Sequence, residues 1–292
     1  MRSCVIDIGS NTIRAVVYGI IGERFVREFN KGVKSMLFAN TTDGNLSAEG
    51  MAELSSAIAE LRHMTEQFEC EYYAFATSAF RDLKNQDEVI AYINESNGIK
   101  IKVLSGEEEV ECDYLGLQFE TGAVRGVGVD LGGGSCQLMA FSEEGLSQAV
   151  SLPLGCARLR RKFVDGELPT REETQKLYDY VKEKLSVFNS DGAKSLFLMG
   201  GTARAALEIK RVLLADKSRQ DRLSKKELED FVEFAYGAGA VSFLKAVTGK
   251  RYNTVIVGII AFIAIADYVG AESVIVKDCS VRDGYVRKYL MR

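Results

Sequence analysis

Two short segments of this 292-residue chain repeat the same order of residue types, 123 residues apart. Residues 7–12 are Asp-Ile-Gly-Ser-Asn-Thr, and residues 130–135 are Asp-Leu-Gly-Gly-Gly-Ser. Each segment follows an apolar strand-like stretch and leads into a second strand, which a further turn joins to a third. A duplication of this length predicts two similarly folded domains, each opening with an antiparallel meander of three strands.

The rest of each half alternates helical and strand patterns, which indicates an α/β fold. After residue 47, apolar residues recur at steps of three and four, as on the buried face of a helix. Short strands are predicted at 72–77, 99–104, 195–199 and 273–277. We expect a first domain over 1–122, rejoined by a C-terminal helix at about 281–292, and a second over 123–280.

Composition excludes several classes of protein. His63 is the only histidine, so zinc or proteolytic sites built on several histidines are excluded. The net charge of −4 argues against a nucleic-acid partner, and six scattered cysteines without a leader-like start indicate reduced thiols in a cytoplasmic protein. The apolar stretch 255–266 is shorter than the roughly 20 residues of a membrane span, so we expect a buried helix and no membrane insertion. A homodimer surface is the alternative role for this helix.

The two glycine turns carry the first functional signal. Glycine lets the backbone approach a ligand closely, and successive N–H groups with a Ser or Thr hydroxyl can hold phosphate oxygens. Asp7 and Asp130, at the preceding strand ends, can hold Mg²⁺ directly or through water. An ordinary hairpin turn is the alternative, which the repetition makes less attractive. The predicted phosphate-binding residues are Gly9, Ser10, Asn11, Thr12, Gly132, Gly133, Gly134 and Ser135.

Two further segments are weaker candidates. Gly200, Gly201 and Thr202 join a strand to a helix and could form a third phosphate loop, although glycines there are also a common packing device. A basic cluster could attract a long polyanion, although a solvated helix face is an equal alternative. The cluster consists of Arg158, Arg160, Arg161 and Lys162.

Together these segments resemble the exopolyphosphatase / guanosine pentaphosphate phosphohydrolase (Ppx/GppA) family, in its short two-domain form. The resemblance implies two actin-like (ribonuclease H-like) domains of the ATPase superfamily with an interdomain cleft, in which a terminal phosphoryl group is hydrolysed with Mg²⁺. The matching stretches are VIDIGSNTIRAVVY (5–18), ATSAFRDLKN (76–85), VLSGEEEVECDYLGL (103–117), GVDLGGGSCQLMAF (128–141), SLPLGCARLRRKF (151–163), LMGGTARAALE (198–208) and VKDCSVRDGYV (276–286).

By motif position, Glu109 resembles the family's catalytic carboxylate, which activates the attacking water. Asp130 resembles the acid that supports the metal, and Arg81 resembles a phosphate-binding arginine. Phosphoanhydride hydrolysis depends mostly on positioning and charge stabilisation, which suits these residue types. Locally, Glu109 could instead be one of several acids at a helix start, and Arg81 a surface arginine bonded to a nearby aspartate.

Three departures from the family pattern stand out. Gln137 replaces a Glu, Glu111 replaces an Arg, and Arg251-Tyr-Asn253 replaces Arg-Ala-Asp. Strand alternation places Gln137 on the same side as Ser135. Because an amide cannot take a proton, we expect slower hydrolysis, and a rise in turnover on Gln137→Glu.

The leading prediction is an enzyme, an exopolyphosphatase that releases terminal orthophosphate from polyphosphate. Guanosine pentaphosphate is the alternative substrate, and a related ATPase or kinase is a second enzyme class. The alternative outside enzymes is a phosphate- or alarmone-binding regulator with weakened catalysis, which the changes at Gln137 and Glu111 favour.

Overall fold

The structure is a computed structural model that describes residues 1–9, 12–34, 37, 40–216, 218 and 220–291. The chain forms two compact units, residues 1–112 with 282–292, and residues 113–281. The first division falls inside helix α4 (Gly106–Thr121), ten residues before the predicted boundary. The second half of α4 belongs with the second unit because Leu117 packs onto Gly128, where a Cβ would lie 2.8 Å from its side chain.

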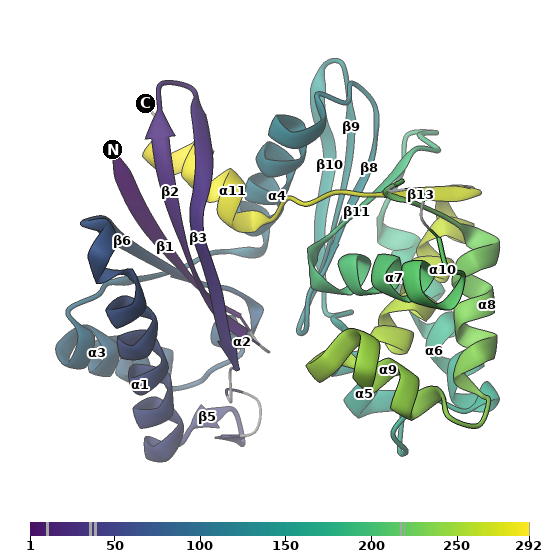
Figure 1. Cartoon of the computed structure of the whole chain (residues 1–292), viewed down its shortest axis with the longest axis horizontal. Coiled ribbons are helices and arrows are strands. Elements are labelled where there is room, and N and C mark those ends of the chain that lie inside the picture. The colour runs from purple at the N-terminus through teal and green to yellow at the C-terminus, as the bar shows by residue number, and fades with distance from the viewer. Residues whose placement is uncertain (10–11, 35–36, 38–39, 217, 219, 292) are drawn as a thin grey trace. The chain divides into compact units, whose positions relative to one another are not determined.

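The first unit contains a sheet in the order β3-β2-β1-β6-β7. β1 pairs antiparallel with β2 and parallel with β6, and β2 pairs antiparallel with β3. Figure 1 shows β1, β2 and β3 in purple as one meander. The strands are β1 (Arg2–Ile8), β2 (Thr12–Ile21), β3 (Arg24–Lys34), β6 (Glu71–Ala76) and β7 (Ile101–Val103), with a separate hairpin of β4 (Thr41–Thr42) and β5 (Asn45–Leu46).

Helix α1 (Ala48–Thr65) packs on this sheet through the apolar face that the spacing predicted, with Leu54, Ile58 and Leu61 buried. It begins at Ser47, whose side chain accepts a hydrogen bond from the Gly50 N–H. This is a favourable N-cap because it satisfies an otherwise unpaired donor. The unit also contains α2 (Ser78–Arg81), α3 (Gln86–Asn97), short 3₁₀ (Glu66–Phe68) and π (Val286–Leu290) helices, and all of α11 (Val281–Tyr285) after its first residue.

The second unit contains a sheet in the order β10-β9-β8-β11-β13-β12. β8, β9 and β10 form an antiparallel meander, and β8 pairs in parallel with β11. The strands are β8 (Gly126–Leu131), β9 (Cys136–Ser142), β10 (Gly145–Leu152), β11 (Leu196–Met199), β12 (Arg222–Ser224) and β13 (Ser273–Val276). The helices are α5 (Cys156–Phe163), α6 (Arg171–Lys184), α7 (Gly200–Leu213), α8 (Lys225–Ala235), α9 (Ala240–Thr248) and α10 (Val255–Val269), with 3₁₀ turns at Leu185–Val187 and Gly249–Arg251.

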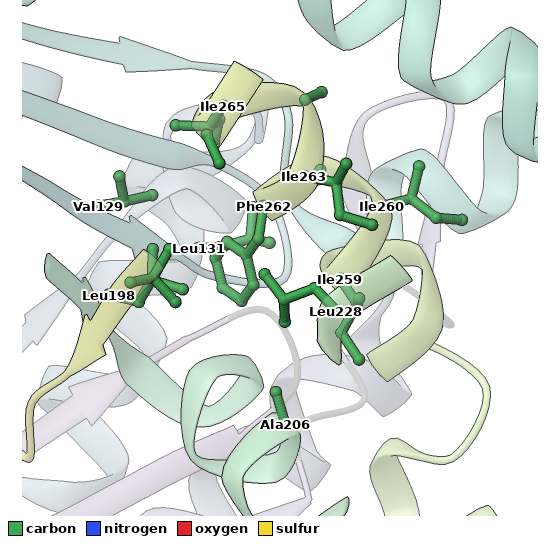
Figure 2. Packing of buried hydrophobic residues seen from close by; sticks show 14 of the residues in the cluster. Val129, Leu131, Leu198, Ala206, Leu228, Ile259, Ile260, Phe262, Ile263 and Ile265 are labelled. Atoms are coloured by element: carbon green, nitrogen blue, oxygen red, sulfur yellow. The ribbon is translucent and has the colours of Figure 1, made fainter. Parts of the chain in front are cut away.

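Helix α10 forms the centre of the second core. Figure 2 shows its Phe262 among Leu131 of β8, Leu198 of β11 and Ala206 of α7. Phe262 is fully buried, so α10 is the core helix that the apolar stretch 255–266 predicted. In the described part of the chain, no single helix is long and apolar enough to cross a membrane, and residues 240–251 and 255–269 reach that length only together, across an 83° bend.

The two sheets repeat one arrangement. In each, the third, second and first strands of a meander precede two strands that continue in parallel from the first. Asp7 and Asp130 occupy equivalent places near the ends of β1 and β8. The strand order therefore confirms the duplication predicted from the two glycine turns.

Candidate functional site

The second glycine turn is shaped by helix α5, which begins directly beside it. A Cβ on Gly155, the residue before α5, would lie 2.3 Å from the backbone of Gly133 and Gly134. Real side chains do not tolerate such an approach, so glycine is required here. The first N–H groups of α5 donate to the carbonyls of Gly132 and Gly133 at 2.9–3.1 Å.

The Arg158 side chain donates through Nε to the Gly134 carbonyl at 3.0 Å. Three successive carbonyls of the turn are thus bonded on the α5 side. In a trans peptide the N–H is antiparallel to the carbonyl, so the N–H groups of Gly133, Gly134 and Ser135 point away from α5. Within the described residues, no backbone oxygen accepts a hydrogen bond from the Gly133 or Gly134 N–H. Consecutive N–H groups that point to the same side of a turn, here away from α5, can bind an anion.

The pairing of β8 with β11 places the third glycine segment beside Asp130. Met199 is the register partner of Asp130. Gly200 has φ +83°, and a Cβ there would lie 2.4 Å from Asp130 Oδ1. The absence of a side chain at Gly200 therefore lets its backbone lie close to the Asp130 carboxylate. Thr202 is buried, and its hydroxyl is directed inside the unit, where it donates to the Leu131 carbonyl at 3.4 Å.

Arg251 also lies beside Asp130 and the third glycine segment. From the sequence it stood out only as the first residue of a motif that differs from the family pattern. A Cβ on Gly201 would lie 2.6 Å from Arg251 Nη2. The guanidinium therefore lies directly over the third glycine segment and adds a positive charge near Asp130. The sequence did offer one signal for Arg251: the arginine of the family's Arg-Ala-Asp pattern is kept, although the two residues after it differ.

Gln137 lies on β9 as the register partner of both Asp130 and Ser151. Its side-chain Nε2 donates to Ser135 Oγ at 2.8 Å and to Ser151 Oγ at 3.0 Å. The residue is only 1% exposed. From the sequence we expected this amide to replace a water-organising acid, whereas in the structure it donates hydrogen bonds to two hydroxyls.

In the first unit, the predicted loop is only partly described. The Gly9 N–H donates to the Thr12 carbonyl at 3.1 Å, closing the turn, while Ser10 and Asn11 lie outside the described residues. At the end of β1, the Asp7 carboxylate forms an ion pair with Arg282 of α11. The side chains of both partners are almost completely buried.

Arg282 is a residue to which the sequence analysis gave no role. Burial alone would lower the pKa of its guanidinium, but the carboxylate of Asp7, with Tyr18 and Asp283, outweighs this and raises the pKa. The Arg282 side chain therefore carries a full positive charge beside the first loop. Its partner lies 275 positions away in the chain, so only the 276–286 motif could have indicated it.

Arg81 and Glu109 are brought together, as their assignment to one site requires. Arg81 Nη1 donates to Glu109 Oε2 at 2.7 Å and to the Leu104 carbonyl at 2.8 Å. The Glu109 side chain is 8% exposed, so this is a shielded carboxylate rather than a solvated acid at a helix start. The guanidinium fixes the direction of the carboxylate.

The neighbouring acids of α4 have structural partners. Glu108 pairs with Lys102 at 2.7 Å, and its pKa is lowered mainly by the hydrogen bond from that lysine. Glu111, which replaces a cation in the family pattern, pairs with Lys288 near the C-terminus. This reversal of charge is therefore compensated within the first unit.

The basic cluster of α5 is divided in its contacts. Arg158 bonds the Gly134 carbonyl, as described above. Arg160 donates to the Gly166 carbonyl at 2.8 Å, and Lys162 Nζ lies 4.1 Å from the centre of the Tyr180 ring. Arg161 is exposed. Arg158 thus contacts the glycine turn, whereas the described contacts of Arg160 and Lys162 are made elsewhere.

Asp7 and Asp130 are the two aspartates whose carboxylates were predicted to hold Mg²⁺. Asp7 already has a cationic partner in Arg282, which disfavours a second cation at that carboxylate. Asp130 lies at the end of β8, just before the second turn, and its carboxylate could hold Mg²⁺ there, although the Arg251 guanidinium is also close by. Among the described residues no group of three or more His, Cys, Asp or Glu side chains could form a metal site. Mg²⁺ does not require such a cage, since it commonly binds one or two carboxylates, water and substrate phosphates.

In sequence, the chain is similar to known proteins. The profile of the Ppx/GppA phosphatase family matches residues 31–292. Exopolyphosphatase 1 of Mycobacterium leprae (strain TN) is 32% identical over 191 residues, which cover 64% of this chain and only 56% of that protein. Exopolyphosphatase 1 of Mycobacterium tuberculosis (strain H37Rv) is 27% identical over 314 residues, covering 99% of this chain and 88% of that protein.

The fold also has a close match among solved structures. The crystal structure of an exopolyphosphatase from Cytophaga hutchinsonii aligns with a TM-score of 0.89, covering 99% of this chain and 98% of that one, at 21% identity. This likeness, together with the repeated strand order of the two sheets, confirms the predicted α/β fold of two similarly built domains.

Proposed function

Because this chain belongs to the Ppx/GppA phosphatase family, we propose that it is an exopolyphosphatase, which hydrolyses the terminal phosphoanhydride bond of inorganic polyphosphate. The observation that carries the proposal is the second glycine turn, whose carbonyls are bonded to α5 so that three successive N–H groups point away from that helix. The choice of polyphosphate is supported by the names of the two mycobacterial relatives.

The chain's own groups suit the steps of such a hydrolysis. The outward N–H groups of the second turn, with the nearby Arg251, would bind phosphate oxygens. In the first unit, Glu109 would orient the attacking water and accept its proton, while Arg81 keeps the carboxylate in one direction. The roles of these residues rest on their contacts and on the motifs that contain them.

Mg²⁺ is part of the proposal, with Asp130 as the protein group that would hold it. When bound, the ion would neutralise charge on the phosphate oxygens. Asp7 is assigned a different role, since its carboxylate holds Arg282. The positive charge of Arg282 would then serve the first glycine turn as a phosphate-binding group.

Orthophosphate release by the purified protein tests the proposal, with polyphosphate, guanosine pentaphosphate and ATP compared at equal phosphate concentration and with or without Mg²⁺. We expect release from polyphosphate to be fastest and to require Mg²⁺. Faster release from guanosine pentaphosphate would make the protein a phosphohydrolase of that nucleotide. Tight binding of either compound without release would favour the regulator hypothesis.

A further inference from the structure

Gln137 connects a phosphate-loop hydroxyl to the sheet through a buried hydrogen-bond network. Its amide nitrogen lies 2.8 Å from Ser135 Oγ and 3.0 Å from Ser151 Oγ. A primary amide nitrogen carries two hydrogens and accepts none, so both bonds run from Gln137 to the serines. With the residue 1% exposed, water does not compete for this amide.

The direction of these bonds decides what Ser135 can do. A hydroxyl has one hydrogen to donate. Because Ser135 accepts from Gln137, its own hydrogen stays available for another acceptor. A carboxylate at position 137 would reverse the bond, since it can only accept, and would take up the serine hydrogen itself.

We propose that Gln137 is a positioning residue that keeps the Ser135 hydroxyl as a hydrogen-bond donor toward a bound phosphate. Ser135 immediately follows the turn whose N–H groups face outward, so the hydroxyl would extend that row of donors. The inference rests on the proposed function, because it takes an anion to be bound at this turn. It replaces the expectation that the amide is a catalytic defect.

The test measures inorganic phosphate binding by titration calorimetry and polyphosphate hydrolysis by kinetics. The variants are Gln137→Glu, Gln137→Met, Ser135→Ala and the two double variants. Gln148→Glu is the matched control, because Gln148 lies on the adjacent β10 and bonds the Val187 carbonyl rather than the turn. Thermal unfolding and circular dichroism check that each variant is folded.

We expect Gln137→Glu to weaken phosphate binding by about 10- to 100-fold, the range for a lost hydrogen bond to a charged group. Because this interaction is present before the chemical step, the loss should appear as a higher KM, with kcat changed less than about threefold. Gln137→Met removes the donor without adding charge, and should weaken binding in the same direction by a smaller factor. In the Ser135→Ala background both substitutions should lose most of their effect.

Other outcomes separate the possible failures. If Ser135→Ala binds phosphate as tightly as the wild type, the hydroxyl does not contact the phosphate and the inference fails, while the N–H groups of the turn remain candidates. If the wild type neither binds phosphate nor releases it from polyphosphate, the proposed function fails. If Ser135→Ala weakens binding and Gln137→Glu does not, the amide oxygen faces the serines and the inference alone fails. Equal losses from Gln137→Glu with and without Ser135 would mean that charge repulsion, rather than the hydroxyl, transmits the effect. A rise in kcat for Gln137→Glu would restore the earlier hypothesis of a missing acid.

Discussion

Glu109 combines burial with a hydrogen bond from the cationic Arg81, and this combination allows a sharp test of its role. Glu109→Gln keeps the size of the side chain and its ability to accept a hydrogen bond from Arg81. If the carboxylate accepts a proton from water, kcat should fall by about 10²–10⁴, the usual range for loss of a general base. Polyphosphate affinity should hold or improve, because a negative charge leaves an anion site.

The matched control is Glu107→Gln. Glu107 lies two residues before Glu109 in the same acidic run, and its side chain is exposed. Steady-state orthophosphate release gives kcat for both variants. Near-wild-type turnover in Glu109→Gln, or equal losses in the two variants, would show that Glu109 is an ordinary acid at a helix start.

Asp7 and Asp130 should respond differently to replacement by asparagine. Asp7→Asn leaves the Arg282 guanidinium buried without its charge partner, which costs about 3–5 kcal/mol in comparable pairs. We expect the free energy of unfolding to fall by this order, while the Mg²⁺ concentration for half-maximal activity stays unchanged. Asp130→Asn should instead raise that Mg²⁺ concentration, because an amide binds this hard cation less well than a carboxylate.

Urea unfolding and Mg²⁺ titration of activity measure the two effects on the same preparations. A shifted Mg²⁺ midpoint in Asp7→Asn with undiminished stability would return Asp7 to the metal-binding role that its sequence position suggested.

At the scale of elements, helix α5 performs two separable tasks. Its N-terminal turn and Arg158 hold the carbonyls of the second glycine turn. Arg160 and Arg161 lie further along and are candidates for contact with distant parts of a long polyanion. Replacing both by alanine should weaken long polyphosphate more than guanosine pentaphosphate, and should flatten the salt dependence of polyphosphate binding. Arg158→Ala should weaken both substrates alike.

Lys176→Ala/Lys226→Ala is the control for net charge, since it removes two exposed lysines from α6 and α8. Binding is measured between low and physiological salt for each variant. Equal losses on both substrates from the Arg160/Arg161 variant, or a control with the same effect, would reduce these arginines to a solvated helix face.

At the scale of the whole molecule, the C-terminal residues 282–292 complete the first unit. Among them, Gly284 packs directly against the backbone of Cys112 in α4. A Cβ on Gly284 would lie 1.6 Å from the Cys112 carbonyl oxygen, a backbone atom that cannot move aside cheaply. Gly284→Ala should therefore displace α11 from α4 and destabilise the first unit by about 3 kcal/mol, the upper part of the usual range for overpacking.

Gly166→Ala is the matched control, because the nearest atom to its Cβ would be the Leu168 carbonyl oxygen at an ordinary 3.5 Å. Urea unfolding gives the stability of both variants, and limited proteolysis locates the loosened region. We expect early cleavage within residues 1–112 for Gly284→Ala alone. An unchanged unfolding midpoint would contradict the close packing of Gly284 on α4.

The features that could be predicted from the sequence are those encoded locally. Strand alternation, helical spacing and glycine turns lie within short windows, so the two meanders, helix α1 and the buried α10 were all predicted. Contacts between distant segments were not, because tertiary packing brings the partners together. Arg282 meets Asp7 across the whole chain, and Arg251 reaches Gly201 only after α7, α8 and α9 have folded back. The Gln137 network was predicted only in part. Strand alternation predicted that Gln137 lies on the same side as Ser135, but the hydrogen bonds to Ser135 and Ser151 became visible only in the structure.

The discontinuity of the first unit has a consequence for synthesis. A ribosome makes residues 113–281 before it makes residues 282–292, so the second unit is available in full while the first still lacks α11. Until then Asp7 has no Arg282, and Phe75 lacks the ring of Tyr285 that stacks on it at 4.9 Å. Domains usually fold in the order in which they emerge. Here the N-terminal unit, although it emerges first, cannot close until the last residues of the chain have been made.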